Sequence, residues 1–381
     1  MAGLHRISYL WKEADAAREY STAVSLHSHT NQSKETLDFL ANLGTQYPFL
    51  RPFFRRCERR ARDLYKIPLN YAVSYWTPPL TPKLAFDLET GQIRQKLGLT
   101  PLVSITDHDT IAAPMLLRTM PSARHIPVSV EWSAPFGGDQ AFHLGIHNLP
   151  SAGGRSWMKV FEEYTAHPDE KRLTEILAAL HALPDVLIVF NHPVWDLYLI
   201  GADKAKQRVN DFLTANHEFI HAFELNGLRN WSENRAVKRL ARQWNKLLIS
   251  GGDRHGLEPN ANVNLTNAGS FAEFVHEIRR EHLSRVLFLP QYRESIATRY
   301  IHFIWQAVRT YPEMQGRERW VDRIFFEPID QPGVIRPITA EWTNGGPAVV
   351  RGFISTIGFL AAPHMRGALR LAFGRQGEVS A

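Results

Sequence analysis

Seven short apolar runs alternate with helical patterns along the first 290 residues, and this alternation constrains the fold most. Most of the runs are rich in β-branched residues or end at Gly, Pro or Asn, as buried strands do. They cover residues 23–30, 102–110, 126–133, 141–147, 186–193, 222–227 and 247–256. Helical patterns lie between most of them, over 34–43, 83–97, 158–182, 203–217 and 230–245. Alternating strands and helices predict parallel βαβ units and an α/β fold.

The ends of these predicted strands favour a closed barrel over an open sheet. Six of the seven carry His, Asp or Glu near the C-terminal end. An open doubly wound sheet concentrates its site at one switch point, whereas a barrel collects residues from every strand end. We therefore predict a distorted seven-stranded (β/α)7 barrel whose mouth gathers these side chains.

The candidate ligands begin with a histidine pair in "VSLHSHT" (24–30). On an ideal strand His27 and His29 point the same way, as do Asp253 and His255 in "GGDRHG". Alone, such a pair could simply be hydrogen-bonded. Burying many ionisable groups together, however, costs on the order of several kcal/mol each unless cations balance them. We therefore predict a metal centre. The other strand-end candidates are His108, Glu131, His143 and His192.

Other sequence features limit the class of protein. The single cysteine, Cys57, excludes an intramolecular disulfide and a cysteine-based zinc site, so a metal would rest on His, Asp and Glu. The N-terminal residues lack a signal-peptide pattern, and the longest apolar stretch (352–362) is too short to span a bilayer. We expect no membrane span and a cytoplasmic location.

The motifs "LHSHT", "ITDHDT", "VEWS", "FHLGIH", "NHP" and "GGDRHG", in this order, resemble the PHP (polymerase and histidinol phosphatase) superfamily of metal-dependent phosphoesterases. The resemblance covers roughly residues 22–290 apart from an insertion. It implies a PHP-type barrel with two or three divalent metal ions (Mn, Zn, Fe or Mg) at its mouth. The implied ligands are His27, His29, Glu131 and Asp253 for one metal, Glu131, His143 and His192 for a second, and His108 and His255 for a third.

Lys34 departs from the family pattern. The first motif usually continues to an Asp seven residues after the first histidine, as a third-site ligand, and Lys34 stands there. The third site is then weaker, completed by another residue such as Asp109, or absent. Lys34 could instead bind substrate phosphate, or simply begin a helix on its solvated face.

Arg254 points away from the ligands on an ideal strand, but a turn could aim it at phosphate. Glu224 and Asn226 could support the ligands or merely end a strand.

The spacing of the motifs predicts the domain organisation. Almost 80 residues separate His29 from His108, where one βα unit needs about 30. We therefore predict a barrel over 1–290 with an insertion at about 44–90, and a C-terminal extension over 291–381. The extension has a helical pattern around 294–310 and no assigned role.

The insertion contains a strongly basic segment. Residues 51–66 hold seven Arg or Lys against Glu58 and Asp63, a net charge of +5 in a chain of net +6. Arginines gathered on one face of a helix repel one another unless an anion offsets them. The segment suggests nucleic acid as a partner, although a solvated helix face is the ordinary alternative.

Two metal ions about 3.5–4 Å apart can activate a bridging water for attack on phosphorus. Asp253 would accept the proton of that water, and His255 or His108 would protonate the leaving oxygen if the third metal is missing. The first hypothesis is a phosphoesterase acting on a small phosphorylated metabolite or nucleotide. The second is a nuclease or oligonucleotide-processing phosphodiesterase, and the third is an inactive binding module. Hydrolysis of a C–N bond by the same centre also remains open.

Overall fold

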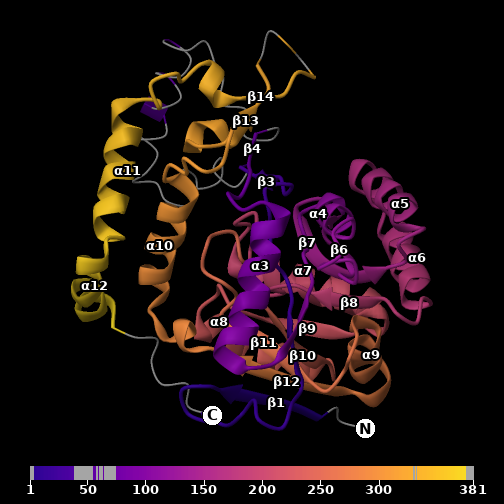
Figure 1. Cartoon of the computed structure of the whole chain (residues 1–381). Helices are drawn as coiled ribbons and strands as arrows, with labels where there is room; N and C mark the ends of the chain where they lie inside the picture. The colour runs from indigo at the N-terminus through magenta and orange to yellow at the C-terminus, as the bar shows by residue number, and fades with distance from the viewer. Residues whose placement is uncertain are drawn as a thin grey trace.

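The computed structural model describes residues 4–37, 55, 56, 59, 63, 74–328, 331 and 333–374. It is an α/β structure whose strands form three sheets, two of them mixed and the third antiparallel (Figure 1). The first sheet has five strands. In spatial order they are β1 (Leu4–Tyr9), β12 (Leu283–Phe288), β11 (Asn262–Thr266), β2 (Thr22–Ser25) and β5 (Thr100–Val103).

The second sheet also has five strands, and most of the predicted runs lie in it. In spatial order they are β10 (Leu247–Gly251), β9 (Ala222–Asn226), β8 (Leu187–Phe190), β7 (Gln140–Leu149) and β6 (Val128–Phe136). Strands β8, β9 and β10 are parallel, as expected. β7, however, is antiparallel to both of its neighbours.

The prediction of a (β/α)7 barrel is wrong, although the α/β class is right. In the described part of the chain the strands form separate sheets and no closed barrel. One reason is the turn between β6 and β7, where Gly137 and Gly138 have φ of 63° and 73° and make a tight hairpin that only antiparallel strands can share. Another is that β1, β11 and β12, which the apolar runs did not reveal, extend the sheet beyond β2.

The two five-stranded sheets approach each other at the ends of several strands. Isolated bridges join Ser28 to Arg254 and His108 to Glu131. Ser28 and Arg254 follow β2 and β10, whereas His108 follows β5 and Glu131 lies in β6. The bridges bring the predicted ligands of both sheets to one place.

Helices cover the sheets, and several of them begin at a side chain that caps the first turn. They are α3 (Pro82–Gln92), α4 (Ala112–Leu117), α5 (Gly154–Ala166), α6 (Glu170–His181), α7 (Ala202–Asn216), α8 (Trp231–Gln243) and α9 (Phe271–His276). Thr81, Asp169 and Asn230 each accept a backbone N–H of the first turn with their side chains, which stabilises a helix by about 1 kcal/mol. The expected helix over 34–43 is wrong at its start, because β3 (Glu35–Thr36) is a short strand.

The largest apolar core lies between the second sheet and its helices. Trp132 of β6 stacks on Phe161 of α5 with 4.4 Å between ring centroids, and Phe190, Phe212 and Phe223 are fully buried nearby. Burying each such side chain contributes roughly 1.5–3 kcal/mol. This core fixes the strands whose ends carry the candidate ligands.

The C-terminal segment packs against the rest of the structure through helices and a third sheet. It contains α10 (Ile296–Val308), β13 (Ile324–Phe326), β14 (Arg336–Pro337), α11 (Ala348–Leu360) and α12 (Arg366–Phe373). β13 pairs with β4 (Tyr75–Trp76), which pairs with β3, and α10 lies beside α11 (Figure 1). The tail thereby meets the chain that follows β2. The predicted domain boundaries stay predictions.

Two predictions concern surfaces and membranes. Of the basic segment, the structure describes Arg55, Arg56, Arg59 and Asp63, which are helical and exposed, and the rest lies outside the described residues. Among the described helices, none is by itself long and apolar enough to cross a membrane; α11 and residues 363–373 pass by length and composition only as a pair bent by 64°.

Candidate metal centre

The structure brings all eight predicted metal ligands together, and a ninth side chain, Glu35, joins them. We call these nine residues the ligand cluster. They form four groups whose ligand atoms lie within 4.8 Å of one another. The groups are His27, Glu131 and His192; His27, His29 and Asp253; His108, Glu131 and His143; and His29, Glu35, His108 and His255.

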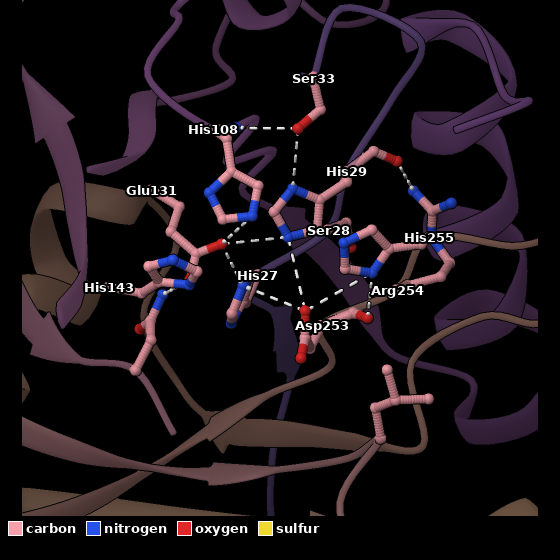
Figure 2. A network of polar contacts seen from close by, with 12 residues as sticks. His27, Ser28, His29, Ser33, His108, Glu131, His143, Asp253, Arg254 and His255 are labelled. Carbon is pink, nitrogen blue, oxygen red and sulfur yellow. Dashed lines mark hydrogen bonds and ion pairs between the residues drawn. The ribbon is translucent and has the colours of Figure 1, made fainter. Parts of the chain in front are cut away.

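The Glu131 carboxylate occupies the centre of the ligand cluster, and Figure 2 shows imidazoles pointing at it. It is fully buried in β6. Its Oε2 lies 2.8 Å from His27 Nε2, 3.2 Å from His29 Nε2 and 3.4 Å from His108 Nε2. Its Oε1 lies 3.3 Å from His143 Nδ1 and 3.2 Å from His192 Nε2. One carboxylate thus touches five imidazoles and could bridge two cations.

Asp253 provides a second buried carboxylate. Its Oδ1 lies 3.6 Å from Nε2 of both His27 and His29 and 3.5 Å from His255 Nδ1. Its Oδ2 accepts a hydrogen bond of 3.2 Å from the Asn226 amide. One oxygen therefore faces the imidazoles, while the other is held by Asn226.

Glu35 is a candidate ligand that the sequence prediction missed. Its Oε2 lies 3.2 Å from His108 Nε2 and 3.1 Å from His255 Nε2. The neighbouring Lys34 is exposed, with its Nζ 5.5 Å from the centroid of the Tyr75 ring. Glu35 in β3 faces the imidazoles of His108 and His255, whereas Lys34, which precedes the strand, points outward from them and lines the cavity above. Asp109, the expected substitute, instead accepts the Ser133 N–H. An acidic residue one position from the motif was the signal.

Glu224 holds His27 and His192 in place through hydrogen bonds. Its carboxylate accepts a hydrogen bond of 2.6 Å from His27 Nδ1, which turns His27 Nε2 toward Glu131, and one of 2.8 Å from the His192 backbone N–H. A carboxylate that orients a ligating imidazole is common around metals. Gly251 makes room for it, because a Cβ there would lie 1.6 Å from Glu224 Oε1.

The backbone is strained at three of the ligands. His27, His192 and Asp253 have φ of 61°, 28° and 53°, in a region that residues other than glycine rarely adopt. Such strain costs on the order of 1 kcal/mol or more per residue and is concentrated at functional sites. It also corrects the predicted reason for their convergence. The strands end at Ser25 and Gly251, so His27 and Asp253 are aimed by the following loops and not by strand alternation.

The buried carboxylates and imidazoles of the ligand cluster shift one another's pKa values. Burial by itself would raise the pKa of Glu131, but the imidazoles of His27, His108 and His143 hold that pKa well below its usual range. Burial would lower the pKa of His27, but Glu131, Glu224 and Asp253 raise it well above its usual value. At His143 burial dominates and lowers the pKa to about 4. Without a cation, protonated imidazoles must compensate the buried carboxylates.

The donor set fits divalent metal ions. His29 Nε2 is buried and has no hydrogen-bond partner, although it lies near carboxylate oxygens of Glu131 and Asp253. A nitrogen placed in this way is oriented for a cation between the carboxylates. Imidazole with carboxylate is the ligand set of Zn, Fe and Mn centres.

The two predicted phosphate-binding residues lie in different surroundings. Lys34 lines the cavity above the ligand cluster. Arg254 is buried, donates to Glu89 at 2.9 Å and to the His29 carbonyl at 3.2 Å, and points away from the imidazoles (Figure 2). These contacts support a structural part for Arg254. The sequence reasoning missed Arg229, which lines the cavity with its guanidinium 3.8 Å from Asp253 Oδ2.

A cavity of about 430 Å³ opens onto the ligand cluster. Its floor consists of Glu35, His108, His143, His192, Asp253 and His255. Most of its wall is apolar, and by "cavity wall" we mean Trp76, Trp195, Leu228, Tyr300, Phe303 and Ile304. A pocket of this size takes a small molecule.

Comparison with protein-family models finds no match, and comparison with curated proteins finds none either. Among solved structures, the chain is similar to a crystal structure of a protein from Bifidobacterium adolescentis, provisionally assigned as a metal-dependent phosphoesterase. The identity is 16%, the match covers 53% of this chain and 91% of that one, and the TM-score is 0.32. Similarity at this level carries no argument, so a function has to be inferred from the site.

Proposed function

We propose that this chain is a metal-dependent hydrolase of phosphoric esters that acts on a small phosphorylated molecule. The observation that carries the proposal is the Glu131 carboxylate, fully buried and within 3.4 Å of five imidazoles at the base of a cavity. The motif order that resembles the PHP superfamily agrees with this activity. A structural cluster has no need of a cavity above it or of strained backbone beneath it.

Three sets of residues would hold metal ions. Asp253 with His27 and His29 would hold one ion. His143 and His192 would hold a second ion, and Glu131 would contribute to both. Glu35 would complete a third set with His108 and His255. Bound divalent cations would supply a nucleophile from water near neutral pH and stabilise charge on the phosphoryl oxygens.

The side chains around the ions have separate parts in this proposal. Asp253 has Oδ2 directed at Asn226 and Arg229, and both groups stabilise its charged form, which favours ligation over the proton-accepting role first predicted. Arg229 could donate to a phosphoryl oxygen beside it. His108 and His255 both contact Glu35, which favours ligation over the acid role first predicted for them. Glu224 fixes the imidazole of His27.

The alternatives are less well supported by the described residues. A nuclease depends on the basic segment, most of which lies outside them, and among the described residues only Lys34 and Arg229 bring a lysine or arginine charge to the cavity. An inactive module would not need the ligands to converge. Small phosphate esters therefore come first.

The test is hydrolysis by metal-reconstituted protein. Chelator-treated full-length protein is loaded separately with Mn, Zn, Fe or Mg and assayed on an aryl phosphate monoester and the matching diester. At least one metal should restore activity on one of the esters, and Asp253→Asn should abolish it. If no metal supports hydrolysis of either ester while the ions remain bound, the proposed function is wrong.

A further inference from the structure

We infer that the substrate carries a flat apolar or aromatic group within one or two bonds of its ester oxygen, and that α10 of the C-terminal segment supplies part of the surface that selects it. The inference rests on the proposed function and deepens it. It follows from how closely aromatic side chains approach both ends of the ligand cluster.

One aromatic side chain adjoins the cluster at His143 and His192. The Trp195 ring lies 5.0 Å from His192 and 6.1 Å from His143, both edge-on, by ring centroids. The Arg229 guanidinium covers this indole at 3.8 Å. Arg229 Nε is buried without a hydrogen-bond partner. This side therefore places beside the cluster an indole that Arg229 covers on one face, together with a cation that can still donate.

The other aromatic side chains adjoin the cluster at His255. The Phe303 ring lies 5.9 Å from His255 and 6.4 Å from Trp76, and Trp76 stacks at 6.3 Å from His255. Phe303 shares one face of α10 with Tyr300 and Ile304, since residues three and four apart on a helix are neighbours. All three line the cavity. Helix α10, which is distant in sequence from most of the ligand cluster, thus lines the cavity above it.

This arrangement limits which leaving group can be attached to the phosphoryl group of the substrate. A phosphoryl group held by the ligand cluster places its ester oxygen at the cavity floor. The apolar surface begins directly beside that floor, because Trp195 and Phe303 contact ligand imidazoles. A sugar or polyol there would exchange hydrogen bonds with water for apolar contacts, which is unfavourable. A ring attached close to the ester oxygen would lie against Trp195, Trp76 and Phe303.

The test compares binding of phenylphosphonate and methylphosphonate, which cannot be hydrolysed. Calorimetry uses metal-loaded full-length protein at a pH where both are dianions. We expect phenylphosphonate to bind about tenfold more tightly, because only its ring is transferred from water to the cavity wall. Phe303→Ala should reduce this preference roughly threefold or more and leave methylphosphonate binding unchanged. Phe303→Leu, which restores apolar bulk, should recover part of it.

Phe353→Ala is the matched control. Phe353 is 52% exposed on α11 and does not line the cavity, so neither affinity should change. Equal affinities of the native protein for the two phosphonates would overturn the inference and leave the proposed function intact. If Phe303→Ala weakened the binding of both phosphonates equally, this would also overturn the inference and leave the proposed function intact. If metal-loaded protein binds neither compound, both the proposed function and the inference are wrong.

Discussion

The ligand cluster and the cavity wall meet at one cavity, but different kinds of side chain build them. The cluster is made of ionisable groups in mutual contact, held by buried strands, by the loops that follow them and by strained backbone. Part of the cavity wall comes from α10, which is only partly buried and packs against α11 and α12. Changes in the cluster should therefore abolish chemistry, whereas changes in the wall should alter preference among substrates.

The largest effect is expected from Glu131→Gln. The amide keeps the size of the side chain but cannot balance two cations or five imidazoles. We expect metal content to fall and kcat/KM to drop on the order of 10³-fold, which corresponds to about 4 kcal/mol. Elemental analysis and kinetics on the same preparation provide the measurement. A variant that keeps both its metals and its activity would remove Glu131 from the centre of the account.

Glu224→Gln should have the next largest effect. Glu224 contacts no cation in the proposed assignment but orients His27, so metal affinity or kcat/KM should fall roughly 10–100-fold. Metal affinity is measured by titration, and kcat/KM is measured on the same preparation. Glu175→Gln on α6, whose side chain is exposed, is the control and should behave as native. An unchanged titration for Glu224→Gln would show that His27 does not need this support.

Neighbouring residues test the third set of ligands. Glu35→Gln should lower the number of bound ions by about one per chain and the rate by roughly tenfold, because the first two sets keep all their ligands. Lys34→Ala should keep every ion, since Lys34 points outward. Native stoichiometry in Glu35→Gln, or a lost ion in Lys34→Ala, would reverse the assignment.

The smallest expected effect concerns thermal stability, which should depend on metal bound at the ligand cluster and not on the cavity wall. Chelation should lower Tm, because a ligand present at about 100 times its Kd stabilises the folded state by about 2.7 kcal/mol. Phe303→Ala should show the same chelator-induced shift in Tm as the native protein, because Phe303 holds no metal. Differential scanning calorimetry with and without chelator measures both. A much smaller shift in Phe303→Ala would mean that the cavity wall helps to build the ligand cluster.

The sequence predicted the ligand cluster better than the fold. Imidazoles and carboxylates at strand ends are visible in single motifs, so all eight predicted side chains lie together in the structure, while their role as ligands stays a prediction. Glu35 was missed because Lys34 stands at the expected position and the direction of a two-residue strand cannot be read from sequence. The barrel was wrong because apolar runs give no strand direction. The Gly137–Gly138 pair, a hairpin signal, was not used.

The cavity wall could not have been predicted from the sequence. Trp76 and Phe303 lie more than 200 residues apart and meet across the cavity only after β4 pairs with β13 and α10 packs beside them. The prediction for Arg254 shows the same limit. On an ideal strand Arg254 points away from the two ligands beside it, and only a turn could aim it at phosphate. In the structure it contacts Glu89, while Arg229 lines the cavity.

The most direct test of the central claim is a crystal structure of manganese-loaded protein with data collected at the manganese absorption edge. We predict at least two anomalous peaks per chain, one between Asp253 and the His27–His29 pair and one between Glu131 and the His143–His192 pair. Peaks at neither position, with the imidazoles still in contact with the carboxylates, would contradict the account.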